Sequence, residues 1–385
     1  MKKINFIKSY KKTFIGSVNL KNLSLPVIFN QDYKYLKKAL KEKEVSTYGK
    51  YTKIFEKNLQ KYVKSKYVIS TINGSSAMQI SMIATGIKEN HEVLMPSFNY
   101  ISNANAASNC GAVPHFVDCE EETFGVCPKK LIEYLNRISV KVGGKLINKK
   151  TKRIIKAIVL VYIFGHPPKM DELIAIAKRF KLIILEDAAE ALGSYYKGKH
   201  AGTFGTIGTL SFNGNKIITT GGGGAVLTNS KKIADKIKKL SSNGRKFHRW
   251  KFIFDTKGYN YRLPSINSAM GISQLKNLNR IIKKNRSLFK EYMSFFNSNN
   301  EIKVQKEPKY SRSNYWLQTL VLNGKLSSKR DMIIKKFIKD QVEVRAGWDL
   351  LSETKMYKNC PKMKLENSKK LISRIINIPS RKILS

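Results

Sequence analysis

The fold and the chemistry of this chain are best predicted from the stretch Ser211-Phe212-Asn213-Gly214-Asn215-Lys216-Ile217-Ile218-Thr219-Thr220-Gly221-Gly222-Gly223-Gly224. It places one lysine between a Ser/Asn/Gly-rich turn and a run of glycines, with apolar, strand-like residues on both sides. A lysine in a tight, partly desolvated loop loses some of its preference for the charged form, so its amine can attack a carbonyl group. Glycines let the backbone pass close to a bound group. The alternative interpretation is a β-hairpin whose lysine faces solvent.

The sequence before this stretch alternates between short apolar runs and helix-length segments. Strands are expected at Tyr67–Thr71, Glu92–Met95, Val113–Asp118, Ala157–Phe164 and Leu182–Glu186. Helices are expected at Ser75–Ile87, Tyr100–Asn109, residues 129–138 and Met170–Phe180. Because such alternation is typical of βαβ units, it predicts an α/β fold with a mostly parallel central sheet flanked by helices. The basic stretch 141–153 is expected to be an exposed hairpin or loop.

The chain is predicted to form two domains. Residues 1–260 form the large domain, beginning with an irregular segment over residues 1–30 and helices over 31–65. The turn-rich break near Val45–Gly49, which contains Tyr48, is expected to reach a ligand. A long amphipathic helix over about 265–298 leads into a smaller C-terminal α/β domain, so the second predicted unit is 261–385.

The composition describes a globular, strongly basic protein. The chain has 385 residues, 42% of them hydrophobic, and a formal charge of +45. This charge permits nucleic-acid binding, but the basic residues are spread along the whole chain and no nucleic-acid-binding motif accompanies them. We therefore expect no nucleic acid, and a positive surface that attracts anionic nucleotides. Four cysteines without metal-binding spacing, and no signal-peptide or membrane-length apolar run, indicate a cytoplasmic protein without a metal site or membrane insertion.

Polar side chains follow two of the predicted strands, where ligands bind in open α/β sheets. Ser75 and Ser76 come after Tyr67–Thr71, at the start of a predicted helix. Hydroxyl and backbone N–H groups at a helix N-terminus form an anion site suited to phosphate, and the alternative is an ordinary serine helix cap. Asp187 follows Leu182–Glu186. A carboxylate at the end of a buried strand is costly without a cationic partner, and a pyridinium nitrogen would be such a partner. The alternative is that Asp187 caps a helix.

Two more residues complete a set that one cofactor needs. Ser211 lies close enough in sequence to Lys216 to reach the same phosphate, and Tyr100 is placed to stack on a ring. A lysine nucleophile, a carboxylate, a phosphate site and an aromatic platform are together the requirements of pyridoxal 5′-phosphate (PLP). The combination favours the nucleophile over the solvent-facing lysine.

The chain resembles the PLP-dependent nucleotide-sugar aminotransferases of the type I (aspartate aminotransferase) fold. The resemblance covers about residues 25 to 380 and is carried by Asn73-Gly74-Ser75-Ser76-Ala77, Pro96-Ser97-Phe98-Asn99-Tyr100, Gly165-His166-Pro167, Glu186-Asp187-Ala188-Ala189-Glu190, Ser211-Phe212-Asn213-Gly214-Asn215-Lys216 and Gly258-Tyr259-Asn260-Tyr261-Arg262. Ser75 departs from the commoner threonine, and the segment after Trp348 lacks a histidine that is frequent in the family.

The resemblance implies a role for each matching residue. Lys216 is the Schiff-base lysine and Asp187 the partner of the pyridine nitrogen, while the phosphate contacts are Ser75, Ser76 and Ser211. Tyr100 stacks on the ring and Glu190 lies near the cofactor's hydroxyl. Asn260 and Arg262 lie in a loop that, in the family, reaches the neighbouring subunit's site, and Asn260 is one of the implied cofactor contacts. This loop implies a homodimer with shared active sites. The expected substrate contacts are Tyr48, Arg262, Arg345 and Trp348, with Arg345 or Arg262 meeting a carboxylate or a diphosphate.

The implied reaction is transamination in two halves, with pyridoxamine phosphate as the intermediate form of the cofactor. Glutamate is the expected donor, and C4 of a nucleotide-linked 4-keto-6-deoxy sugar the acceptor. The finer likeness is to enzymes of the legionaminic-acid type pathway, which act on UDP-4-keto-6-deoxy-N-acetylglucosamine, and it is carried by Ile217–Gly224, residues 141–153, Arg345 with Trp348, and Asn377–Ser380. GDP- and dTDP-linked sugars are the alternatives for the same reaction, as in perosamine synthases.

Other functions fit the sequence less well. Sugar dehydratases with this fold carry histidine in place of the lysine, so Lys216 disfavours them, and a non-catalytic PLP-binding regulator is the other alternative of the same fold. A dinucleotide-dependent dehydrogenase is disfavoured because no G-x-G-x-x-G motif opens a helix after the first strand.

Overall fold

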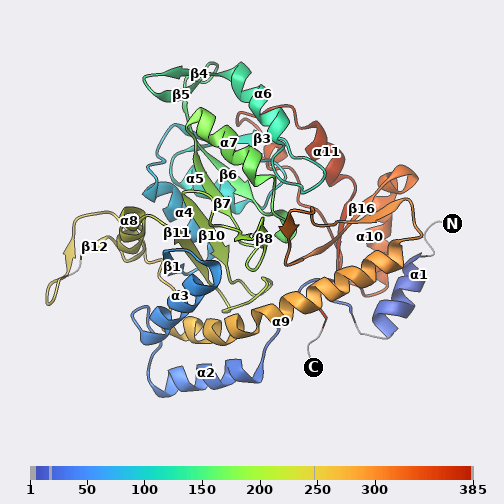
Figure 1. Cartoon of the computed structure of the whole chain (residues 1–385), viewed down its shortest axis with the longest axis horizontal. Coiled ribbons are helices and arrows are strands. Elements are labelled where there is room, and N and C mark those ends of the chain that lie inside the picture. Colours follow the sequence, from blue (N-terminus) through green and yellow to red (C-terminus); the bar gives the residue numbers. More distant parts are fainter. Residues whose placement is uncertain (1–5, 17–19, 247, 383–385) are drawn as a thin grey trace.

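A nine-stranded mixed sheet crosses the middle of the protein (Figure 1) in the computed structural model, which describes residues 6–16, 20–246 and 248–382. Its main path is β1 (Tyr67–Thr71), β11 (Gly224–Thr228), β10 (Ile207–Ser211), β7 (Ile183–Asp187), β6 (Ile154–Val161), β2 (His91–Pro96) and β3 (Val113–Val117). Neighbouring strands from β10 to β3 are parallel, whereas β11 is antiparallel to β1 and β10. The predicted α/β class with a mostly parallel sheet is confirmed.

Helices cover this sheet. They are α3 (Lys50–Val63), α4 (Gly74–Ala84), α5 (Ser102–Asn109), α6 (Pro128–Ile138), α7 (Met170–Phe180) and α8 (Lys231–Ser241), whereas α2 (Asn30–Lys41) lies outside this layer. The long helix α9 (Ser265–Phe296) packs against α2 and α3 and crosses below the sheet toward the C-terminal part (Figure 1). No helix among the described residues is long and apolar enough to cross a membrane.

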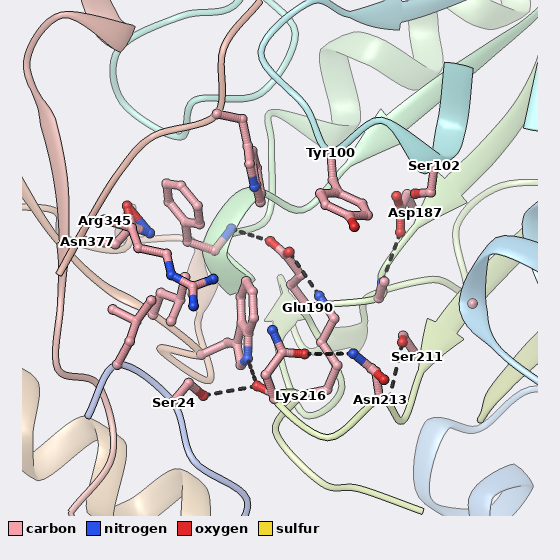
Figure 2. A pocket seen from close by; sticks show the side chains of 18 of the residues that line it. Ser24, Tyr100, Ser102, Asp187, Glu190, Ser211, Asn213, Lys216, Arg345 and Asn377 are labelled. Carbon is pink, nitrogen blue, oxygen red and sulfur yellow. Dashed lines mark hydrogen bonds and ion pairs between the residues drawn. The ribbon is translucent and has the colours of Figure 1, made fainter. Parts of the chain in front are cut away.

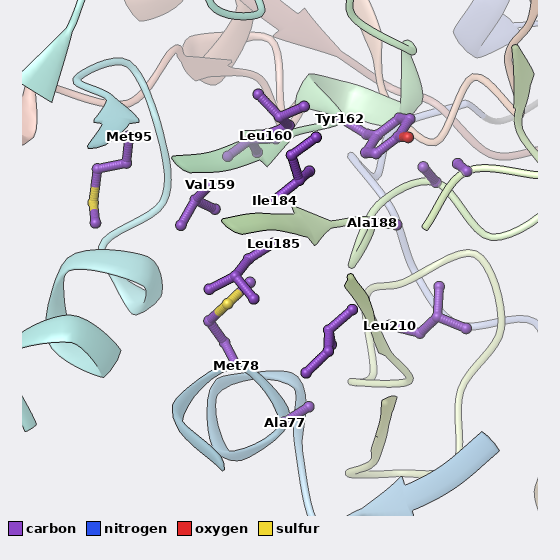
Figure 3. Close-up of a cluster of buried hydrophobic side chains, with 14 of the residues drawn as sticks. Ala77, Met78, Met95, Val159, Leu160, Tyr162, Ile184, Leu185, Ala188 and Leu210 are labelled. Carbon is purple, nitrogen blue, oxygen red and sulfur yellow. The ribbon is translucent and has the colours of Figure 1, made fainter. Parts of the chain in front are cut away.

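Alternating apolar side chains on the central strands fill both faces of the sheet. Leu185 of β7 points toward Met78 of α4, whereas its neighbour Ile184 points to the opposite face (Figure 3). This alternation follows from the two-residue period of a strand, and both side chains are buried. Packing on both faces holds the carboxyl ends of β7 and β10 in fixed positions, and these ends carry site residues.

The C-terminal part has a second hydrophobic cluster and a four-stranded antiparallel sheet. Its strands run in the order β14 (Ile302–Val304), β16 (Gln318–Leu322), β18 (Ile375–Ile378) and β17 (Arg345–Ala346), with α10 (Arg330–Lys339) and α11 (Glu366–Ile372) nearby. The short strands β8 (Tyr195–Tyr196), β9 (Lys199–His200) and β15 (Ser311–Arg312) form a third sheet, and β12 (Arg245–Lys246) pairs with β13 (Ile253–Phe254). Short 3₁₀-helices occupy Gly324–Lys329 and Leu351–Glu353.

The predicted irregular segment 1–30 is wrong for residues 6–16, which form α1 (Phe6–Tyr10) and a π-helix (Lys11–Gly16). The reason is tertiary: Tyr10 and Phe14 are buried against Tyr292 of α9, and the hydroxyl oxygens of Tyr10 and Tyr292 lie 2.8 Å apart. Residues 1–5 lie outside the described residues. The division of the chain at 260/261 stays a prediction, and this N-terminal segment packs with residues of the predicted second unit.

Two further predictions concern the segment between β3 and α7. The basic stretch 141–153 does contain a hairpin, made by β4 (Ser139–Val142) and β5 (Lys145–Asn148). The predicted strand Ala157–Phe164 lies three residues too far along the chain, because β6 runs from Ile154 to Val161 and a 3₁₀ turn follows at Ile163–Gly165. Phe164 and Gly165 both have positive φ angles, which end a strand, yet Ile163 and Phe164 remain buried, so hydrophobicity alone did not mark the end.

His166, just after this turn, makes stability depend on pH. Burial lowers the pKa of His166 to about 3, and neither ring nitrogen has a hydrogen-bond partner among the described residues. Between pH 6.5 and pH 5 the unfolded chain binds a proton there that the folded chain does not, so the free energy of unfolding falls by up to about 2 kcal/mol. His166→Phe keeps a ring beside Tyr315 and is expected to remove that part of the fall. Urea unfolding at both pH values tests this, and an equal fall in the variant would contradict it.

Candidate active site

A cavity of about 730 Å³ lies at the carboxyl ends of β7 and β10. Asp187 ends β7 and Ser211 ends β10, and both line the cavity because β7 and β10 are parallel neighbours. The start of α4, the Lys216 loop and residues of β17 and β18 form further walls. Figure 2 shows Lys216 and Glu190 in the middle, Asp187 and Ser211 on one side, and Arg345 and Asn377 on the other.

Lys216 extends from a tight turn into this cavity. Its backbone N–H donates to the carbonyl of Asn213 at 2.9 Å. The amine Nζ lies 3.0 Å from Glu190 Oε1 and 4.0 Å from the centre of the Trp316 ring. Only 14% of the Lys216 side chain is exposed. The lysine is therefore held by an ion pair and a cation–π contact inside a cavity, and the solvent-facing alternative is excluded.

Glu190 is the counter-ion of that amine. Its Oε2 accepts the backbone N–H of Phe164 at 2.9 Å, so one carboxylate joins the Lys216 loop to the 3₁₀ turn after β6. Burial raises the pKa of Glu190, and Lys216 opposes this rise. An acid held between these two effects can balance the charge of the amine or exchange a proton with it.

Asp187 is a mostly buried carboxylate without an ion pair among the described residues. Its Oδ2 accepts the side-chain amide of Asn103 at 2.6 Å, and its Oδ1 accepts the backbone N–H of Ala189 at 3.1 Å. These two hydrogen bonds fix the carboxylate at the edge of the cavity. A buried carboxylate without a cation is costly, and a cationic ring nitrogen bound in this cavity would remove that cost.

The start of α4 forms a narrow cradle beside Ser211. Asn73 caps the helix by accepting the Ser76 N–H at 2.7 Å. A Cβ at Gly74 would lie 3.0 Å from Ser211 Cβ, and one at Gly224 would lie 2.5 Å from the backbone of Asn73. Only glycine at 224 therefore lets β11 pass this turn, which explains part of the glycine run. Ser75 lines the cavity and Ser76 does not, so a phosphate contact by Ser76 stays a prediction.

Comparison with known proteins assigns the family. The DegT/DnrJ/EryC1/StrS aminotransferase family model matches residues 26–385. The chain belongs to this family. It is 36% identical over 296 residues to GDP-perosamine synthase of Escherichia coli O157:H7, covering 77% of this chain and 76% of that protein.

Two further proteins are similar to most of the chain. The chain is 31% identical over 354 residues to UDP-4-amino-4,6-dideoxy-N-acetyl-beta-L-altrosamine transaminase of Campylobacter jejuni (serotype O:23/36, strain 81-176), covering 91% of this chain and 90% of that one. The crystal structure of a DegT DnrJ EryC1 StrS aminotransferase from Brucella abortus superposes with a TM-score of 0.83 and 26% identity, covering 92% and 91% of the chains.

Members of the DegT family are PLP-dependent sugar aminotransferases, and this chain is one of them. The cavity fits the cofactor on three independent observations. Asp187 lacks a cationic partner among the described residues, and the Lys216 amine lies inside the cavity. The cradle is lined by Gly74, Ser75 and Ser211, whose small or absent side chains leave room for a bound group. Lys216 would hold the aldehyde end, Asp187 the ring nitrogen, and the cradle the phosphate.

The other predicted site residues fall into two groups. Tyr100, Arg345 and Trp348 line the cavity, and the rings of Tyr100 and Trp348 lie 6.3 Å apart. Tyr48, Asn260 and Arg262 do not line it. Arg262 Nη2 instead pairs with Glu56 Oε1 at 2.9 Å, and its Nη1 is buried without a partner among the described residues. Roles for Asn260 and Arg262 in a neighbouring subunit therefore stay predictions.

The structure adds residues that the sequence did not single out. Asn103 holds Asp187, and Trp316 lies under the Lys216 amine while its indole N–H donates to the carbonyl of Asn215 at 2.7 Å. A segment over residues 23–26 forms another wall of the cavity, and Ser24 donates to the carbonyl of Asn215 at 2.9 Å. No spacing rule marks these residues, because their partners lie far away in the sequence.

Proposed function

We propose that this protein transfers an amino group from glutamate to C4 of a nucleotide-linked 4-keto-6-deoxy sugar, for the biosynthesis of a cell-surface polysaccharide or a nonulosonic acid. The single observation that carries the proposal is the meeting of Lys216 and Asp187 in one cavity of a DegT-family chain. Lys216 supplies a nucleophile and a proton carrier, and Asp187 supplies a fixed negative charge. A homodimer with shared active sites is part of the proposal.

Bound PLP supplies an aldehyde that accepts the donor's amine and a ring that takes up the electrons of a carbanion. Lys216 Nζ moves the proton at the donor's α-carbon, and Asp187 holds a proton on the ring nitrogen. Glu190, 3.0 Å from Nζ, balances the charge of the amine while it is free. The cavity walls and the mostly buried position of Lys216 limit the access of water to the reacting atoms.

For the acceptor we propose UDP-4-keto-6-deoxy-N-acetylglucosamine first. It is supported by similarity over 91% of the chain to a protein named as a UDP-4-amino-4,6-dideoxy sugar transaminase. A GDP-linked 4-keto-6-deoxy sugar is the second candidate, because the 36% identical relative is named GDP-perosamine synthase. Both candidates have the same reacting ketone and differ in nucleotide and sugar substituent, so the residues around Lys216 do not discriminate between them.

The experiment is turnover of the PLP-loaded protein with glutamate and a panel of UDP-, GDP- and dTDP-linked 4-keto-6-deoxy sugars. Mass spectrometry should detect a 4-amino sugar, with 2-oxoglutarate formed in equal amount. A product that has lost water without gaining nitrogen would indicate a dehydratase. No reaction with any sugar, from protein that binds PLP, would instead favour a non-catalytic regulator.

A further inference from the structure

We propose that Arg345 and Asn377 form the subsite that binds a carboxylate of the amino-acid donor. This inference rests on the proposed function, and it chooses the carboxylate over the diphosphate as the partner of Arg345. It also adds Asn377 and Glu343 to the substrate-binding wall.

The first support is the distribution of charge around the cavity. Among the described residues that line it, Lys216 and Arg345 are the only cations. Lys216 already pairs with Glu190 and is needed at the cofactor. Asp187, Glu190 and Glu343 supply three carboxylates to the same lining. One guanidinium that does not serve the cofactor, among three acids, suits a monoanionic carboxylate, whereas a diphosphate would require more positive charge than this wall offers.

The second support is the relative position of the two side chains. Arg345 of β17 and Asn377 of β18 are paired residues in the antiparallel register, so they lie next to each other on the same face of the sheet. Figure 2 shows the two side chains together, with the Arg345 guanidinium extending toward Lys216 and Glu190. The Arg345 side chain is 66% exposed, which leaves its donors accessible from the cavity.

The third support is an unpaired side-chain oxygen on Asn377. Asn377 is 3% exposed, and its Oδ1 is buried without a hydrogen bond among the described residues. Buried amides are nearly always hydrogen-bonded in folded proteins, so an unpaired one in a cavity wall points to a missing ligand. As an acceptor, this oxygen cannot itself bind a carboxylate. When the amide turns over about its last bond, its NH₂ group takes the unpaired position and donates to a carboxylate held by the neighbouring guanidinium.

The Arg345 guanidinium already binds a carboxylate of the protein, that of Glu343. Glu343 Oε1 accepts from Arg345 Nη2 at 2.9 Å, and its Oε2 accepts the backbone N–H of Leu23 at 3.0 Å. Glu343 therefore stands where the donor's carboxylate would bind. Because the pair is exposed, it contributes little to stability, and a substrate carboxylate can displace it while Glu343 keeps its bond to Leu23. A planar guanidinium binds carboxylates through two parallel hydrogen bonds, which fixes the orientation of the donor.

The test uses PLP-loaded Arg345→Gln and follows the two half-reactions separately through the cofactor's absorbance. Loss of the guanidinium should lower kcat/KM for the glutamate half-reaction about 100-fold, because charged hydrogen bonds are removed. The reverse half-reaction with a UDP-linked 4-amino-4,6-dideoxy sugar should change less than about 3-fold, since its groups bind elsewhere. Arg312→Gln, an exposed arginine of β15 outside the cavity, is the matched control and should leave both half-reactions unchanged.

Binding of glutarate, a dicarboxylate without an amine, gives a readout that does not require turnover. Calorimetry should show about 100-fold weaker glutarate binding in Arg345→Gln and about 10-fold weaker binding in Asn377→Ala. An equal loss in both half-reactions, a loss confined to the sugar half-reaction, or unchanged glutarate affinity would each overturn the proposal. If the wild-type protein aminated no sugar, the proposed function would fail, but glutarate binding would still decide the subsite.

Discussion

Lys216→Ala is expected to abolish transamination, with kcat reduced by about 10⁴-fold or more, because one side chain supplies both the covalent attachment and the proton transfer. In the structure the amine is paired with Glu190 and stacked on Trp316, so it is already directed into the cavity. No other lysine lines the cavity among the described residues, and none can replace it there. The variant should also lose the visible absorbance band of the cofactor's imine.

The measurement combines turnover with chemical trapping. Borohydride reduction of the wild-type protein followed by peptide mass mapping should place the cofactor on Lys216, and the variant should stay unlabelled. Lys169→Ala is the matched control, because Lys169 forms an ion pair with Glu122 at 3.1 Å outside the cavity. It should be labelled at Lys216 as in the wild type. A label at another lysine, or activity in Lys216→Ala within 10-fold of wild type, would show that Lys216 is not the residue that binds the cofactor covalently.

The elements that carry the site were predictable from the sequence because local patterns determine them. The strand Tyr67–Thr71 and the helix Met170–Phe180 have the predicted bounds, since each is a short apolar or amphipathic run between turn residues. Ligands bind at the carboxyl ends of the strands in such sheets, so Ser75 and Asp187, which follow two predicted strands, were expected at the site, and both line the cavity. The family resemblance, now shown over residues 26–385, added the expected role of each residue.

The rest depended on contacts between distant residues. The helical turn over residues 6–16 is stabilised by burial of Tyr10 against Tyr292, and no local pattern reveals that contact. Asn103 lies in a predicted helix of small and polar residues, where nothing distinguishes it from its neighbours until β7 brings Asp187 beside it. In the sequence, Asn377 stands out only as part of the family likeness at Asn377–Ser380, because its side-chain oxygen becomes buried and unpaired only in the folded chain.

Asp187→Ala should reduce kcat by about 10³-fold, the second largest effect that we expect, because a fixed charge aimed at a developing charge is worth about that much. The carboxylate is fixed by Asn103 and Ala189, so it is oriented before any ligand binds. Without it, the cofactor's ring nitrogen would lose its proton near neutral pH, and the ring would accept electrons poorly. The PLP affinity and the pH dependence of the cofactor's absorbance should both change.

Asn103→Ala separates the charge of Asp187 from its orientation. This variant keeps the carboxylate and removes the 2.6 Å hydrogen bond that positions it, so we expect a loss of about 10-fold in kcat and little change in PLP affinity. Asp187→Asn keeps the size of the side chain but removes the charge, and the new NH₂ group can face the NH₂ group of Asn103. The reduction in kcat in Asp187→Asn should therefore approach that in Asp187→Ala. If Asp187→Asn retained most of the activity, the carboxylate would serve only to cap the end of β7, as the Ala189 N–H contact by itself would allow.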